Sequence, residues 1–177
     1  MADLITLATY KDAEGLSTPK EDLRINALIP SVSQLVKTYC GNSFVDFYSS
    51  NKTETFNVDW GTYIVQLTES PVNAIVSVQE RNAYNNAYTT LTTGAYEYSL
   101  DTKTDSILRT TSSGYKNWPT GVDAVKVVYT AGYSAVPADL ELAVIDLITY
   151  YLKDEHKERR TIPVSYTHLT LPTKRIV

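Results

Sequence analysis

Cysteine and histidine are scarce in this sequence of 177 residues, which contains one cysteine and two histidines. The single cysteine, Cys40, has no partner for an internal disulfide. No run of about 18 apolar residues occurs, and no basic segment followed by an apolar one opens the chain. We therefore expect a soluble protein that is made in a reducing cytoplasm, keeps its N-terminus uncleaved and does not bind a membrane.

Sequence motifs of catalysis are also missing. The chain has no phosphate-binding loop, no dinucleotide-binding glycine pattern, no nucleophile elbow and no zinc-ligand spacing. The histidines, His156 and His168, are far along the chain from Cys40, and a thiol nucleophile needs a histidine base. We expect Cys40 to be buried and inert. We predict no catalytic residue, no cofactor and no metal site, so the protein should not be an enzyme.

Charge of neither sign dominates. The 16 Lys and Arg residues against 20 Asp and Glu residues give a net charge of −4, which does not favour a surface that binds nucleic acid tightly. Tyrosine is abundant instead, at 14 residues, with 3 Phe and 2 Trp. Tyrosines are typical both of half-buried strands and of protein–protein interfaces, so composition does not choose between these uses.

Helical periodicity occurs toward both ends of the chain. A short helix is indicated over residues 4–16, and a long one should begin with Thr18 as its N-cap and end at Gly41. Pro30 removes a hydrogen bond inside that helix, so we expect a kink or two abutting helices. The segment "YTAGYSAVPADLELAVIDLITYY" then predicts a strand that Gly132 ends and a final helix that begins at Pro137.

Residues 42–133 have a β-type pattern. Six short segments alternate or are rich in β-branched and aromatic residues, namely "FVDFY", "TETFNV", "TYIVQL", "AIVSVQE", "AYEYSL" and "AVKVVYTAG". Two polar loops, residues 81–90 and 110–123, should be exposed tips. The aromatic residues in these loops are Tyr84, Tyr88, Tyr115 and Trp118. Their rings either stack on a sugar or a base, fold back onto their own sheet, or contact a neighbouring subunit.

These patterns predict an α+β fold, namely a small helical bundle of two long helices and a short N-terminal helix, with a β-rich insertion between the long helices. A single domain would span residues 1–160, with its helical core in residues 4–41 and 134–160 and its insertion in residues 42–133. Residues 161–177 would form a separate tail. The two long helices are expected to pack together and to build the core.

A basic cluster near the end of the last predicted helix contains Lys157, Arg159 and Arg160. Such a cluster is typical of a solvated helix end, where Glu155 and Arg159 form an i,i+4 pair. The alternative is a basic contact with an acidic partner. Together with Tyr84, Tyr88, Tyr115 and Trp118, these three residues are the candidate subunit or partner interface.

Three segments, "VKTYCGNSF", "ESPVNAIVSV" and "VKVVYTAGYSAVPADLELAVIDLITYYLKDE", occur in an order that resembles the head-tail connector (adaptor, or head-completion) proteins of tailed bacteriophages. The resemblance extends over residues 4–160. It implies a structural subunit of the phage neck that forms a ring of about twelve copies under the portal protein. That ring would extend the DNA channel, close the filled head and dock the next neck or tail-completion protein.

The resemblance also implies that double-stranded DNA passes through the ring without sequence-specific binding, which suits the net charge of −4. The protein would reside in the virion neck after assembly in the host bacterial cytoplasm. The alternative function is a carbohydrate- or surface-binding β-rich module that uses the aromatic loops. Residues 164–177 contain "SYTHLTLPT", which we interpret as a translated adapter sequence; a native segment that reaches the portal is the alternative.

Overall fold

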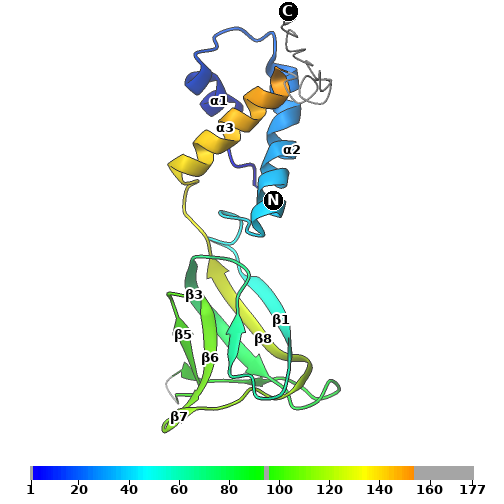
Figure 1. Cartoon of the computed structure of the whole chain (residues 1–177), viewed down its shortest axis with the longest axis vertical. Coiled ribbons are helices and arrows are strands. Elements are labelled where there is room, and N and C mark those ends of the chain that lie inside the picture. Colours follow the sequence, from blue (N-terminus) through cyan, green and yellow to red (C-terminus); the bar gives the residue numbers. More distant parts are fainter. Residues whose placement is uncertain (1, 94–95, 154–177) are drawn as a thin grey trace, which may run out of the picture.

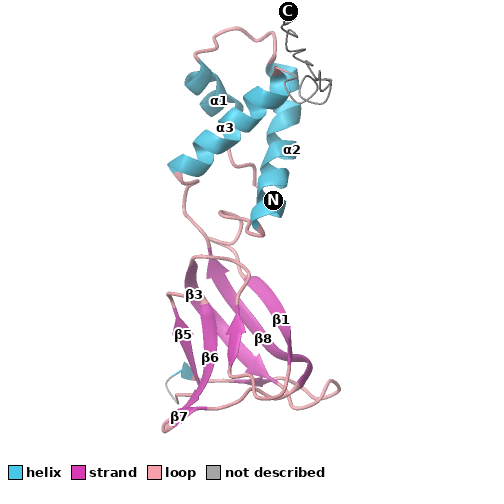
Figure 2. Cartoon of the chain, in the orientation of Figure 1, coloured by secondary structure: helices cyan, strands magenta, loops and turns pink. Residues whose placement is uncertain are grey.

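Two separate hydrophobic cores divide the chain into a helical body at one end and a β-sandwich at the other (Figure 1). The computed structural model describes residues 2–93 and 96–153. Its helices and strands do not mix in space, and a narrow joint of loops connects the two bodies (Figure 2). The described part of the molecule is therefore elongated, with surfaces at both ends and along its sides.

The helical body contains α1 (Leu7–Glu14), α2 (Asp22–Cys40) and α3 (Ala138–Leu152). α2 and α3 run alongside each other in opposite directions (Figure 1). The hydroxyl groups of Tyr10 and Thr149 lie 2.9 Å apart and hold α1 against α3. The buried residues of this core are Leu4, Ile5, Tyr10, Ile25, Ile29, Val32, Val144, Ile145 and Ile148.

The ends of α2 confirm one sequence prediction and correct another. Gly41 ends the helix with φ of 66°, as predicted for a left-handed C-cap. The helix begins at Asp22 and not next to Thr18, because residues 19–21 form a bend and a turn. A single helix runs through Pro30, so the chain does not divide into two helices there.

The sandwich is made of two antiparallel sheets. One has the strand order β1-β8-β3-β4, and the other has the order β2-β6-β5, with β7 paired to β6. The strands are β1 (Lys52–Val58), β2 (Ile64–Gln66), β3 (Val72–Glu80), β4 (Thr89–Thr90), β5 (Tyr98–Asp101), β6 (Ser106–Thr111), β7 (Gly114–Tyr115) and β8 (Gly121–Ala131).

The two sheets share one core because alternate residues of facing strands point inward. Val125, Val127 and Tyr129 of β8 are completely buried, and so is Ile107 of β6 in the opposite sheet. An ion pair also connects the sheets: the guanidinium of Arg109 in β6 lies 2.9 and 3.0 Å from the two carboxylate oxygens of Glu80 in β3.

The predicted fold class, a small helical bundle with a β-rich insertion, is wrong. The fold is mainly β, since two antiparallel sheets enclose the larger of the two cores, and α2 and α3 are only 19 and 15 residues long. The predicted strand "FVDFY" forms turns, while β6 was not predicted at all. The sequence of β6 does not indicate a strand, because Ser106 and Arg109 are polar residues that are buried within it.

The joint confirms the predicted order of strand, glycine, proline and helix. β8 ends at Ala131, Gly132 has φ of 99°, and Pro137 immediately precedes α3. The amide of Tyr133 donates a 2.7 Å hydrogen bond to the carbonyl oxygen of Phe44, in the loop that leaves α2. Both chain segments that cross between the bodies are thus bonded to each other.

Candidate interaction surfaces

A buried carboxylate fixes the joint from inside. Glu69 is 5% exposed, and its Oε2 accepts hydrogen bonds from the amide and the hydroxyl of Ser43 at 2.8 and 2.9 Å. Its Oε1 lies 2.9 Å from the ammonium of Lys52, which also pairs with Glu54 at 2.8 Å. A buried charge is tolerated when such partners surround it. The network is therefore structural and leaves no group free for chemistry.

The same surroundings shift acid–base equilibria. Burial raises the pKa of Glu54, but hydrogen bonds from Lys52 and Thr68 outweigh it and hold that pKa below its ordinary value. Burial raises the pKa of the Tyr129 phenol well above its ordinary value. Its hydroxyl oxygen accepts a 3.2 Å hydrogen bond from the amide of Glu69. At neutral pH Glu54 is therefore ionised and Tyr129 is neutral.

A second buried pair holds the start of the chain. The ammonium of Lys37 in α2 lies 2.9 Å from both carboxylate oxygens of Asp46 and donates to the carbonyl oxygen of Ala2 at 2.7 Å. The two side chains are 4% and 10% exposed. Residues at the N-terminus are thereby attached to one side of α2.

The loops at the far end of the sandwich hold the predicted aromatic residues. Tyr84 is 63% exposed, whereas Tyr88 is half-buried and donates a 2.7 Å hydrogen bond to the carbonyl oxygen of Asp123. The guanidinium of Arg81 lies 4.6 Å from the centre of each of the two tyrosine rings. Tyr84 and Tyr88 thus meet around one cation, which attaches their loop to its own sheet.

Of the two aromatic residues in the other predicted loop, one is exposed and one is buried. Tyr115 is 69% exposed, and its ring centre lies 5.2 Å from that of Tyr63. Trp118 is 2% exposed and belongs to the sandwich core, with its amide donating to Thr62 at 2.8 Å. Trp60, not among the predicted residues, is 90% exposed in the neighbouring turn.

The predicted residues Lys157, Arg159 and Arg160 lie outside the described residues.

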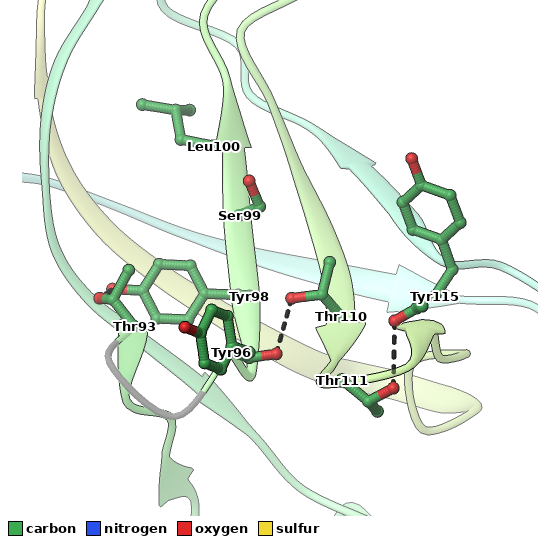
Figure 3. Close-up of a pocket in the computed structure, with 9 residues that line it drawn as sticks. Thr93, Tyr96, Tyr98, Ser99, Leu100, Thr110, Thr111 and Tyr115 are labelled. Carbon is green, nitrogen blue, oxygen red and sulfur yellow. Dashed lines mark hydrogen bonds between the residues drawn. The ribbon is translucent and has the colours of Figure 1, made fainter.

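A surface pocket of about 430 Å³ opens beside these loops (Figure 3). Its lining includes tyrosines and threonines of β5 to β7 and of the segment before β5, namely Thr93, Tyr96, Tyr98, Thr110, Thr111 and Tyr115. The hydroxyl of Thr110 donates to the carbonyl oxygen of Tyr96 at 2.8 Å, and that of Thr111 donates to Gly114 at 3.1 Å. These donors are already used within the protein, which weakens the case for a sugar site.

A second, apolar surface was missed by sequence reasoning. Three pockets of about 240, 250 and 360 Å³ are lined by residues of both α2 and α3. We call the first two the α2–α3 groove; its residues are Leu28, Ser31, Val32, Leu35, Val36, Tyr39, Leu147 and Tyr151. Leu35 and Tyr39 lie on α2, which was expected to build the core with the last helix, yet they are 46% and 91% exposed.

Cys40 lines the third pocket and is exposed, so the prediction of a buried thiol is wrong. It is the last residue of α2 and lines that pocket together with Leu140 and Ala143 of α3. Within residues 2–93 and 96–153, no group of His, Cys, Asp and Glu side chains is arranged to hold a metal ion. In the same part of the chain, every helix is too short or too polar to cross a membrane.

Comparison with known proteins gives one family and several similar folds. The family model "HCP: Head completion protein" matches residues 3–174. No curated protein matches the chain in sequence.

The similar folds come from solved particles. A chain from "Neck of empty GTA particle computed with C6 symmetry" has a TM-score of 0.59 at 18% identity, covering 84% of this chain and 78% of that one. A chain from "Neck of native GTA particle computed with C12 symmetry" has a TM-score of 0.54 at 14% identity, covering 86% and 82%. A chain from "Virion of native gene transfer agent (GTA) particle" has a TM-score of 0.59 at 18% identity, covering 84% and 78%.

Proposed function

The chain belongs to the head completion protein family, and from this premise we propose that it forms a ring in the neck of a tailed phage particle. Membership in this family makes it a structural protein, and the prediction that it is not an enzyme is confirmed. The match over residues 3–174 is the observation that carries the proposal, because it includes both the helical body and the sandwich.

Two observations support the proposed ring: the symmetry of the particles that contain similar folds, and the elongated shape of the subunit. Chains of similar fold occur in neck particles of C6 and C12 symmetry. A closed ring requires each copy to present two different surfaces, one to each neighbour. An elongated subunit has two long sides for these contacts and two ends for other partners (Figure 1). We propose about twelve copies, in line with the C12 relative.

The two ends of the elongated subunit would contact the particle components above and below the ring. Exposed aromatic residues are enriched in protein interfaces, and the far loops of the sandwich expose Trp60, Tyr84 and Tyr115. We assign these loops to the next neck or tail-completion protein, which leaves the helical end for the portal protein. DNA would pass along the ring axis without sequence-specific binding, as the net charge of −4 permits.

In this proposal residues 1–160 act as one connector unit, although they contain two cores, because the buried networks at the joint hold the bodies together. Residues 161–177 are proposed as a tail outside this unit. The subunit would assemble in the cytoplasm of the bacterial host and remain in the virion neck.

Imaging tests the proposal. The full chain, alone and mixed with an assembled portal ring, should be examined by electron microscopy after separation by size. We expect rings whose height spans one subunit, stacked on the portal. A chain that stays monomeric under both conditions would contradict the proposed ring.

A further inference from the structure

The exposed side of α2 carries no charge over about four turns. The exposed residues of the helix from its fifth position onward are Asn26, Ala27, Pro30, Ser31, Gln34, Leu35, Thr38, Tyr39 and Cys40. Lys37, the one charged residue in this stretch, is buried against Asp46. A helix face in contact with water normally carries charged residues, and loss of charge is the compositional mark of an interface core.

The α2–α3 groove runs beside this uncharged face. Its two pockets meet at Leu35, and the pocket nearer the joint is lined only by Leu35, Val36, Tyr39 and Leu147. A volume of about 250 Å³ accommodates a large apolar side chain from another molecule. The groove is thus suited to receive an apolar residue and offers little to a charged or polar partner.

The opposite side of the same helix pair is covered in part. The amide of Leu4 donates to the hydroxyl of Ser33 at 3.0 Å, and Tyr10 of α1 meets Thr149 of α3. The N-terminal residues and α1 therefore pack on that side. Among the residues that the structure describes, no segment packs over the α2–α3 groove, as the 91% exposure of Tyr39 indicates.

α3 carries a matching apolar residue on its other side. Leu142 is 60% exposed, and at 100° per residue it lies about 140° around the helix from Leu147, which lines the groove. It shares its face with Thr149, which contacts α1. The helical body therefore has a receiving groove on one side and a protruding leucine on the other.

We propose that the α2–α3 groove is the docking site for a second copy of this chain, which inserts the Leu142 side of its own α3. The inference rests on the proposed ring and names its interface. Each such contact leaves one groove and one Leu142 free, so the association is head-to-tail and can continue around a closed ring. A second copy fits better than an unrelated partner because both surfaces belong to one body, where Leu142 and the groove residue Leu147 are only five residues apart on α3.

Three variants of the full chain test this interface by sedimentation velocity and native mass measurement. Leu35→Glu places a charge in the groove, and Leu142→Glu places one on the opposite side. Each should weaken association by at least about 30-fold, the effect of losing an interface hot spot. Leu23→Glu is the matched control: Leu23 is 89% exposed on the same helix but lies outside the groove, and this variant should assemble like the wild type.

Mixing the two defective variants distinguishes a head-to-tail interface from a symmetric one. The Leu35→Glu chain keeps its Leu142, and the Leu142→Glu chain keeps its groove, so one sound contact can form between them. We expect dimers in the mixture, no rings, and monomers of each variant alone. Absence of dimers in the mixture would overturn the proposed pairing.

The wild-type chain gives a further readout without substitution. Cys40 directly follows the groove residue Tyr39, so the reaction of its thiol with a soluble disulfide reagent should slow as the protein concentration rises and copies associate. Circular dichroism would verify that each variant folds.

Intact rings of the Leu35→Glu variant would overturn this interface and leave the ring proposal standing, whereas a wild type that never associates would contradict both.

Discussion

A β-carbon placed on Gly132 would lie 2.2 Å from the carbonyl oxygen of Phe44. That oxygen accepts the amide hydrogen of Tyr133, so the two chain segments that cross the joint are in direct main-chain contact. The backbone at Gly132 also has φ of 99°, which a side chain disfavours. Glycine is therefore required here by both contact and conformation.

Gly132→Ala should destabilise the protein by about 3 kcal/mol, because the new methyl group meets main-chain atoms that cannot turn away. Urea unfolding followed by circular dichroism measures the loss. Gly41→Ala is the control: its φ is 66°, but no atom lies within 4 Å of the added carbon. That variant should lose only about 1 kcal/mol. Equal losses in the two variants would contradict the close contact.

Glu80→Ala should cost about 3 kcal/mol of unfolding free energy, because it leaves the buried guanidinium of Arg109 without its carboxylate. Combining it with Arg109→Met should cost less than the sum of the two single losses, as measured in a double-mutant cycle by urea unfolding. Asp123→Asn is the control, since Asp123 is more exposed and its pair with Arg81 is longer, at 3.6 Å. It should change stability by less than about 1 kcal/mol. Strict additivity of the Glu80 and Arg109 losses would show that the pair does not couple the sheets.

Stability should fall at acid pH through Glu54. Its folded-state pKa is lowered, so its contribution to the free energy of unfolding is complete above the unfolded-state pKa of about 4.3 and is lost as pH falls through the lower folded-state value. Urea unfolding of the wild type and of Glu54→Gln, measured from pH 7 down to pH 3, isolates this residue. The difference between the two should shrink with falling pH. A constant difference would exclude a role for Glu54 ionisation.

Tyr115→Ala and Trp118→Ala should behave in opposite ways, although Tyr115 ends β7 and Trp118 follows it by only three residues. Trp118→Ala removes a core side chain and should cost about 3 to 5 kcal/mol of stability. Tyr115→Ala should change stability by less than about 0.5 kcal/mol but weaken binding of the next neck protein, as titration calorimetry would measure. Unchanged binding by both Tyr115→Ala and Trp60→Ala would remove the far loops from the proposed docking surface.

The local signals in the sequence were reliable where one residue type determines the backbone. Gly41 and Gly132 were predicted to end their elements, and both have the positive φ that favours glycine. Pro137 was predicted to start a helix, and it directly precedes α3. These predictions need no knowledge of distant contacts.

The fold class depended on distant contacts and was therefore missed. The sandwich core forms only when β1 pairs with β8, for example Lys52 with Tyr129, and alternation alone does not reveal such partners. Helical stripes are easier to recognise, so the helices were given too much of the core. The apolar periodicity of α2 includes the exposed residues Leu35 and Tyr39, because periodicity shows that a face is apolar and not what covers it.

Tyr115 and Trp118 show the same limit at the candidate surfaces. Both lie in a segment predicted as a polar loop without hydrophobic period. The side chain of Trp118 is in the sandwich core and its amide bonds to Thr62, far away in the sequence, whereas Tyr115 is exposed. The missing charge on α2 was visible in the sequence as the stretch from Ile25 to Val36, which contains no charged residue. The sequence alone does not show that this uncharged stretch is a surface, because only the structure reveals that part of it faces outward.

The mass of the wild-type assembly in solution tests the central claim most directly. A ring of about twelve subunits of 19.8 kDa would weigh about 240 kDa by native mass spectrometry. We predict a closed species near this mass, alone at high concentration or on the portal, with no continuous series of larger polymers. A single species at the mass of one chain, at every concentration and with the portal present, would contradict the proposed neck ring.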